Sequence, residues 1–143
     1  MAEIRGAEVS AVEVADRFGR TAKRLARAFD DALASHGVST PRARALLEVA
    51  AKGPVRLAAV AVAIGIAQGT ASEMVDVLVR DGLLARSADP SDRRAVLLKA
   101  TPPGLARAEQ WRAAYEQAAA DLFGPLSPAQ RAQLLELLEA LDF

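Results

Sequence analysis

The sequence predicts a mainly α-helical fold: a winged helix-turn-helix with one β-hairpin, the wing, flanked by N- and C-terminal helices. Three observations support this prediction. Alanine, the best helix former, supplies 33 of the 143 residues, whereas aromatic residues supply only 4%. Capping residues, glycines and prolines divide the chain into helices at clear positions. Two β-prone segments flank one Asp-Pro-Ser-Asp turn.

The first two helices are delimited by capping residues, glycines and prolines. Ser10-Ala11-Val12-Glu13 has the spacing of a capping box, and apolar residues then recur with a period near 3.6. His36-Gly37 suits the end of this helix, because glycine accepts the left-handed conformation found there. Thr40-Pro41 predicts the cap and first residue of a second helix, which Gly53-Pro54 ends.

A helix-turn-helix and a hairpin occupy the middle of the chain. A third helix is expected from about residue 56 to 64, and a fourth from about 68 to 81, with Gly65 in the tight turn between them. Strands at 83–87 and 95–99 flank Asp89-Pro90-Ser91-Asp92, which suits a type I turn. This hairpin is the only convincing strand signal in the sequence.

Two helices complete the predicted fold. Thr101-Pro102 begins one that runs to about Leu122, and Ser127-Pro128-Ala129-Gln130 is a capping box for the last. The leucines of the last helix are typical of core or interface packing. We therefore expect one domain over 1–143, with outer helices at 8–36 and 101–143 around a winged lobe at 40–100.

Composition excludes several classes of function. Without cysteine, the chain has no disulfide, thiolate metal site or catalytic thiol, and its single histidine, His36, argues against a His-rich zinc or haem site. We find no nucleophile–base pair and no phosphate-binding glycine loop, so we expect neither an enzyme nor a cofactor. With no apolar run of about 18 residues and no signal peptide, we expect a cytoplasmic protein without a membrane partner.

Charge is distributed unevenly along a chain whose formal net charge is zero. Residues 40–100 contain nine basic and six acidic side chains, a net charge of +3, whereas residues 101–143 have a net charge of −3. A basic winged lobe is a weak indication of nucleic-acid binding. The second helix of such a pair can enter the major groove, and the hairpin can follow the backbone.

Three motifs over about thirty residues resemble the MarR family of bacterial transcriptional regulators. They are a leucine-rich helix ending in Asp-Gly-Leu at 75–86, a wing with Asp-x-Arg at 89–98, and Thr-Pro-x-Gly at 101–104. The order of the other helices is also similar, so the resemblance covers nearly the whole chain. It implies a homodimer that binds a pseudo-palindromic operator in double-stranded DNA, usually as a repressor. Many such proteins release DNA when a small aromatic or lipophilic effector binds between the lobes.

The resemblance also implies roles for individual residues. The start of the fourth helix would read bases, Asp92 would brace the wing turn, and Arg94 would approach DNA together with Arg93, Arg86 at the wing base and Arg56 before the third helix. The base-reading candidates are Gln68, Gly69, Thr70 and Ser72. Trp111 and Tyr115, four residues apart, would line an effector cleft. Apolar residues of the outer helices predict the dimer interface: Phe18, Leu25, Phe29, Leu134, Leu138, Leu141 and Phe143.

One departure from the family pattern concerns charge. From Leu57 to Val79 there is no Lys or Arg, and Glu73 or Val77 stands where the family often has a basic residue. A carboxylate is repelled by phosphates and is useful only as an acceptor from a cytosine amino group. We therefore expect weak electrostatic attraction from this helix.

Each candidate also has a simpler interpretation. Gln68, Thr70 and Ser72 can merely cap a helix, and Arg93-Arg94 can form an ordinary solvated turn. Glu73 can be solvated or paired within the subunit, and His36 can be structural rather than a sensor. Trp111 and Tyr115 can serve core or dimer packing. The corresponding functional alternative is a winged-helix module that binds protein and has weak or no specific DNA binding.

Overall fold

The computed structural model describes residues 8–141, and over that range it contains six helices and three strands. In chain order they are α1 (Ala11–Ala34), α2 (Thr40–Lys52), β1 (Val55–Arg56), α3 (Leu57–Ile64), α4 (Gln68–Arg80), β2 (Leu84–Asp89), β3 (Asp92–Ala100), α5 (Pro102–Phe123) and α6 (Pro128–Glu139).

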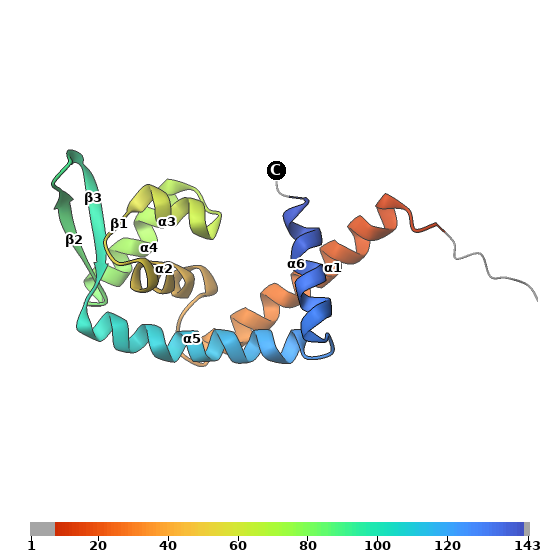
Figure 1. The fold of residues 1–143 in the computed structure, drawn as a ribbon. Helices are drawn as coiled ribbons and strands as arrows, with labels where there is room; N and C mark the ends of the chain where they lie inside the picture. Colours follow the sequence, from red (N-terminus) through yellow and green to blue (C-terminus); the bar gives the residue numbers. More distant parts are fainter. Residues whose placement is uncertain (1–7, 142–143) are drawn as a thin grey trace, which may run out of the picture.

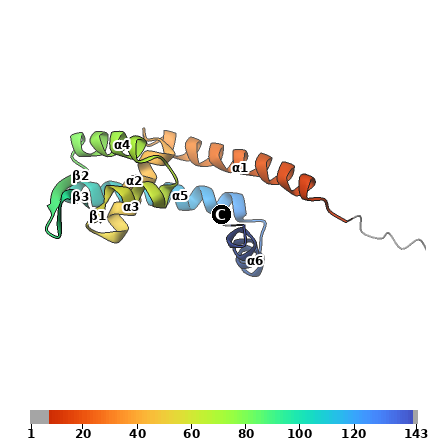
Figure 2. The ribbon, with the colours of Figure 1, turned by 90° about the horizontal axis from the view of Figure 1, so that it is seen from above.

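The winged lobe, α2 to β3, lies at one end of the long helix α5, and α6 lies at the other end (Figure 1). Helix α1 packs on α5 through its C-terminal part, and its N-terminal half extends away from the lobe in both views (Figures 1 and 2). The mainly α winged helix-turn-helix fold predicted from the sequence is confirmed. The lobe and the outer helices are thus joined chiefly through α5.

The helix-turn-helix and the wing have the predicted order. Helices α3 and α4 meet at an angle of 110°, and Gly65 in the turn has a φ of +71°. Strands β2 and β3 form an antiparallel hairpin in which Asp89 is paired with Asp92, so its strands extend beyond the predicted ends. A third, two-residue strand adds to the hairpin, because Val55 and Arg56 pair with β3 and give the sheet order β1-β3-β2.

The predicted capping box is complete at α6 but only half formed at α1, where the Ser10 amide makes no bond to the Glu13 side chain, and the predicted cap of α2 is displaced by one residue. Ser127 and Gln130 form both bonds of the predicted capping box, and Ser10 accepts from the Glu13 amide. The cap of α2, however, is Ser39, whose hydroxyl oxygen accepts from the Arg42 amide at 3.4 Å. The predicted cap, Thr40, is instead the first residue of the helix, and its hydroxyl donates to Asp30 of α1 at 2.6 Å.

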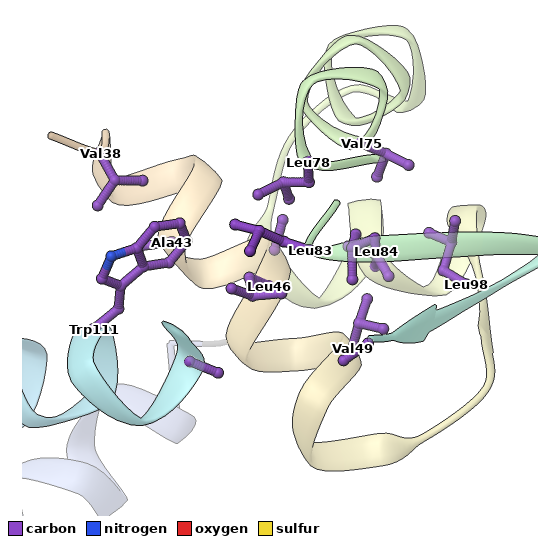
Figure 3. Packing of buried hydrophobic residues seen from close by; sticks show 14 of the residues in the cluster. Val38, Ala43, Leu46, Val49, Val75, Leu78, Leu83, Leu84, Leu98 and Trp111 are labelled. Carbon is purple, nitrogen blue, oxygen red and sulfur yellow. The ribbon is translucent and has the colours of Figure 1, made fainter. Parts of the chain in front are cut away.

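Aliphatic side chains from every element of the lobe form one core (Figure 3). The largest fully buried ones include Leu46 of α2, Leu78 of α4 and Leu98 of β3. Trp111 enters the same core from α5 beside Val38 and is 97% buried, with 3% of its surface exposed. The core therefore joins α5 to the lobe.

The start of α5 is hydrogen-bonded to the backbone of the segment that follows α4. Thr101 donates from its amide to the Leu83 carbonyl at 3.1 Å and from its hydroxyl to the Gly82 carbonyl at 2.5 Å. A Cβ at Gly104 would lie 1.9 Å from the Leu83 carbonyl oxygen, so no larger residue fits there without a backbone shift. The Asp-Gly-Leu and Thr-Pro-x-Gly motifs therefore meet in space.

No single helix between residues 8 and 141 has the length and apolar character needed to cross a membrane. Only α3 and α4 taken together meet the same criteria, as a pair bent by 110°.

Candidate nucleic-acid interface

Helix α4 buries one side and exposes the other. Its buried side consists of Ala71, Val75 and Leu78, which follow the i, i+4, i+7 spacing of a single helix face. The predicted base-reading residues lie outside that face: Gln68, Gly69 and Thr70 are exposed and Ser72 is half-buried. None of these residues caps the helix by a side-chain bond, because the N-cap is Ala67 and makes no such bond.

The charges on the exposed side of α4 are acidic. Asp76 forms an ion pair with Arg86 of β2, which connects the recognition helix to the base of the wing. Glu73 is exposed, and among residues 8–141 it makes no ion pair or side-chain hydrogen bond. Arg86 was predicted to face DNA, but its charge is compensated within the lobe.

The wing turn is organised around Asp89, which is 93% buried, with only 7% of its surface exposed. Its Oδ1 accepts from the Ser91 hydroxyl at 2.7 Å and from the Ser91 amide at 2.9 Å. Its Oδ2 accepts from Arg56 Nε at 2.9 Å and from Arg56 Nη2 at 2.7 Å. Arg56, a predicted phosphate contact, therefore joins β1 to the tip of the wing.

These contacts lower the pKa of the Asp89 carboxyl from its ordinary value of 3.8 to about 2. The hydrogen bonds from Ser91 contribute most, and the Arg56 guanidinium adds to them, because each favours the charged carboxylate over the neutral acid. Burial opposes this shift but is outweighed. The wing turn is thus built on a permanently charged carboxylate at neutral pH.

The tip of the wing presents two arginines. Arg93 and Arg94 are exposed, and neither forms an ion pair within the described part of the chain. Asp92 Oδ1 accepts from the Arg94 amide at 3.0 Å. The hairpin therefore presents two arginines without an ion-pair partner next to its turn.

The predicted interface residues of the outer helices differ in burial. Phe18, Leu138 and Leu141 are exposed, and Leu25 and Leu134 are half-buried. Phe29 is buried within the protomer, where its ring stacks on Tyr115 with centroids 4.0 Å apart. Phe143 lies outside the described residues.

Trp111 and Tyr115 line different cavities. Trp111 borders a cavity of about 300 Å³ together with His36, Arg42 and Arg107. Its indole nitrogen, on the side of the ring turned away from Leu46 in Figure 3, is buried and has no acceptor. Tyr115 borders a separate cavity of about 250 Å³, lined by residues of α2, α3 and α5, so the two aromatic residues do not share one cleft.

The sequence does not predict the ion pairs of Asp89 and Asp76, although it places Asp89 in the wing turn. Their arginine partners lie 33 and 10 residues away in sequence, too far for a local pattern to indicate. The Asp-Pro-Ser sequence signals the local Ser91 bonds, since Asp commonly accepts from the amide two residues on. Among residues 8–141, no group of three or more His, Asp or Glu side chains is placed to bind a metal ion.

Known proteins similar to this chain are transcriptional regulators. The sequence profile of the MarR family matches residues 36–95. A transcriptional regulatory protein named for the hcr operon of Thauera aromatica is 37% identical over 106 residues, which are 71% of this chain and 62% of that protein. The chain therefore spans less than two thirds of that relative's length. The HTH-type transcriptional regulator YkoM of Bacillus subtilis is 30% identical over 73% of this chain and 68% of its own length.

A solved structure extends the similarity to the outer helices. BpsR of Bordetella bronchiseptica, described in a study of how 6-hydroxynicotinic acid regulates its DNA binding, superimposes with a TM-score of 0.80. The two chains are 30% identical, and the match covers 90% of this chain and 98% of BpsR.

The geometry of Asp89 generates a pH-dependent prediction for the wing. Because the folded pKa lies below the ordinary value, the contribution of this carboxylate to stability is present above about pH 4 and is lost as the pH falls through about 2. We expect Asp89→Asn to lower the melting temperature at pH 7, and the difference from wild type to shrink between pH 4 and pH 2. Asp92→Asn, at an exposed position, should cost less. A constant difference across this range would contradict the assignment.

Proposed function

Because the chain belongs to the MarR family of transcriptional regulators, we propose that it is a homodimeric repressor that binds a pseudo-palindromic operator through its winged lobes. The observation that supports this most strongly is the wing tip, where two exposed arginines stand on a turn held by the buried Asp89. An arginine at the tip of a hairpin can enter a minor groove, whose narrow A·T tracts attract cations.

The distribution of charge supports a wing tip that supplies most of the attraction to DNA. Arg56 and Arg86 are paired with Asp89 and Asp76, and helix α4 has no basic residue before Arg80. Each cation that contacts a phosphate releases counterions and steepens the salt dependence of binding. The exposed residues at the start of α4 then discriminate between bases, while the wing supplies affinity.

Replacing Arg93 and Arg94 together by Ala tests this division. We expect affinity to fall for all DNA sequences, and the slope of log K against log salt to decrease by about one unit per lost contact. Thr70→Ala should instead change which bases are preferred and leave the slope nearly unchanged. The measurement is operator binding at several salt concentrations, with the operator obtained by selection from genomic DNA.

The protein-binding alternative is favoured by one observation, the absence of any Lys or Arg from Leu57 to Val79. If the variant with both Arg93 and Arg94 replaced by Ala binds DNA as tightly as the wild type at every salt concentration, the wing does not have the proposed role. If the wild type selects no DNA at all, the winged lobe serves as a module for protein contacts instead.

The homodimer is supported by apolar side chains that the protomer leaves uncovered. Eight of them lie on or beside the N-terminal half of α1 and on or beside α6, which has no buried residue: Val9, Val12, Val14, Phe18, Leu135, Leu137, Leu138 and Leu141. In Figures 1 and 2 the N-terminal half of α1 extends away from the winged lobe, and α6 lies apart from the lobe at the far end of α5. Such a surface suits an obligate interface, which commonly buries over about 2,000 Å².

Leu138→Asp should convert the dimer to a monomer. Leu138 is 39% exposed in the protomer, so the fold tolerates the charge there, whereas a dimer interface would bury it unpaired. Leu105→Asp is the matched control, since Leu105 on α5 is 48% exposed and lies at the winged-lobe end of that helix. Sedimentation velocity should show a dimer for the wild type and the control. A monomeric wild type would rule the proposal out.

A small aromatic acid is the effector class that the cavity beside Trp111 favours. Two buried donors, Trp111 Nε1 and Arg42 Nε, have no acceptor, and Arg107 adds a second guanidinium to the lining. A carboxylate would accept from these donors, and the rings of Trp111 and the side chains of Val38 and Leu83 offer apolar contact. Asp81, the C-cap of α4, also lines the cavity, and the guanidiniums of Arg42 and Arg107 would have to outweigh its negative charge for a carboxylate to bind.

Trp111 is the only tryptophan of the chain, so its fluorescence reports directly on this cavity. We expect benzoate to change that fluorescence saturably and the neutral amide, benzamide, to have little effect. Arg107→Gln should weaken benzoate binding by roughly tenfold or more, because a hydrogen bond to a charged group contributes about 1.5–3 kcal/mol. Arg112→Gln is the control, since Arg112 pairs with Glu109 and borders the other cavity. Equal responses to benzoate and benzamide would reject a carboxylate site.

A further inference from the structure

We propose that Glu73 selects cytosine at one position of each operator half-site and at the same time weakens binding to all other DNA. This inference rests on the proposed DNA-binding function. The proposed function does not explain why helix α4, the recognition helix, carries an uncompensated carboxylate.

Glu73 lies at the middle of the exposed side of α4. At 100° per residue, its direction is roughly opposite to those of Ala71, Val75 and Leu78, the buried residues of the helix. Gly69 precedes it by one turn on the same side and has no side chain, and a Cβ there would meet nothing within 4 Å. The carboxylate is therefore unobstructed toward the N-terminal end of the helix, the end that reads bases in a helix-turn-helix.

The other acidic residue on the exposed side of α4 is not available in the same way, because it is paired. Asp76 is neutralised by Arg86, whereas Glu73 has no ion pair and no side-chain hydrogen bond within residues 8–141. The nearest basic residue along α4 is Arg80, two turns away. When α4 enters a groove, Glu73 thus carries a full negative charge between two rows of phosphates.

The donor and acceptor groups that each base presents in the major groove determine which bases Glu73 can bind. In the major groove, guanine presents O6 and N7 and thymine presents O4, all acceptors that repel a carboxylate. Cytosine presents the N4 amino group, which donates to Glu or Asp. Adenine also presents an amino group, N6, but beside the acceptor N7, so a carboxylate there gains one bond and meets one repulsion. Repulsion from phosphates lowers affinity everywhere, and a cytosine opposite Glu73 offsets it best. The missing cations of α4 and this carboxylate then serve the same end, discrimination at the expense of general affinity.

Glu73→Gln tests the inference with an isosteric change. Sequences bound by wild type and variant are selected from one random double-stranded pool, and affinities are then measured for the selected site and for random DNA. We expect the wild type to enrich cytosine at one symmetric position and to lose roughly 5- to 150-fold in affinity when that base is changed. The variant should lose this preference, move toward adenine, which glutamine can bind through N6 and N7, and bind random DNA about 2- to 5-fold more tightly.

Glu116→Gln is the matched control, because it removes the same charge from an exposed position on α5. It should change neither the base preference nor the affinity for random DNA. Glu73→Ala should lose the cytosine preference without gaining one for adenine, which separates the loss of the acceptor from the new glutamine contact.

Two results would overturn the inference, and they differ in what else they overturn. If the wild type selects an operator and Glu73→Gln selects the same bases, Glu73 is a solvated side chain and only this inference fails. If the wild type selects no DNA, the proposed function fails with it.

Discussion

The first turn of α5 lies against the backbone of Leu83 so closely that only glycine fits at position 104. This contact, with the two bonds from Thr101 to Gly82 and Leu83, joins the end of α4 and the start of the wing to the helix that leads out of the lobe. Trp111 adds a second attachment two turns further along α5, where it enters the lobe core. Two attachments on one helix fix its direction, which neither would do alone.

The direction of α5 determines where the rest of the molecule lies. Helix α1 packs along it, and α6 follows at its far end (Figure 1). In a dimer formed by the outer helices, the separation of the two recognition helices therefore depends on the junction at Gly104 and Trp111. The cavity beside Trp111 lies at this same junction, bordered by residues of α2 and α5 and of the segments that follow α1 and α4, so a ligand there would contact the helix that sets the spacing.

The electrostatics of the lobe separate structural charges from available ones. Arg56 and Arg86 hold the wing to the body of the lobe through Asp89 and Asp76, and their charges are compensated there. Arg93 and Arg94 remain exposed at the tip. The exposed side of α4 before Arg80, by contrast, carries neutral side chains, the paired Asp76 and the unpaired Glu73. Under the proposed function, attraction to DNA and discrimination between bases would therefore come from different elements.

The sequence by itself determined the elements whose signals are local: the glycine at position 65 in its left-handed turn, the Asp-Pro-Ser turn of the wing and the capping box at Ser127. A cap, a turn or a helical period depends on neighbours within a few residues, so it can be predicted from the sequence. The three motifs also identified the family. Tertiary structure alone decided the pairing of β1 with β3, the ion pair between Arg56 and Asp89, and the stacking of Phe29 on Tyr115. It also placed Trp111 and Tyr115 at separate cavities despite their spacing of four residues. Each of these joins segments distant in sequence, and which distant groups meet depends on how whole helices and strands pack, a property that no local pattern contains.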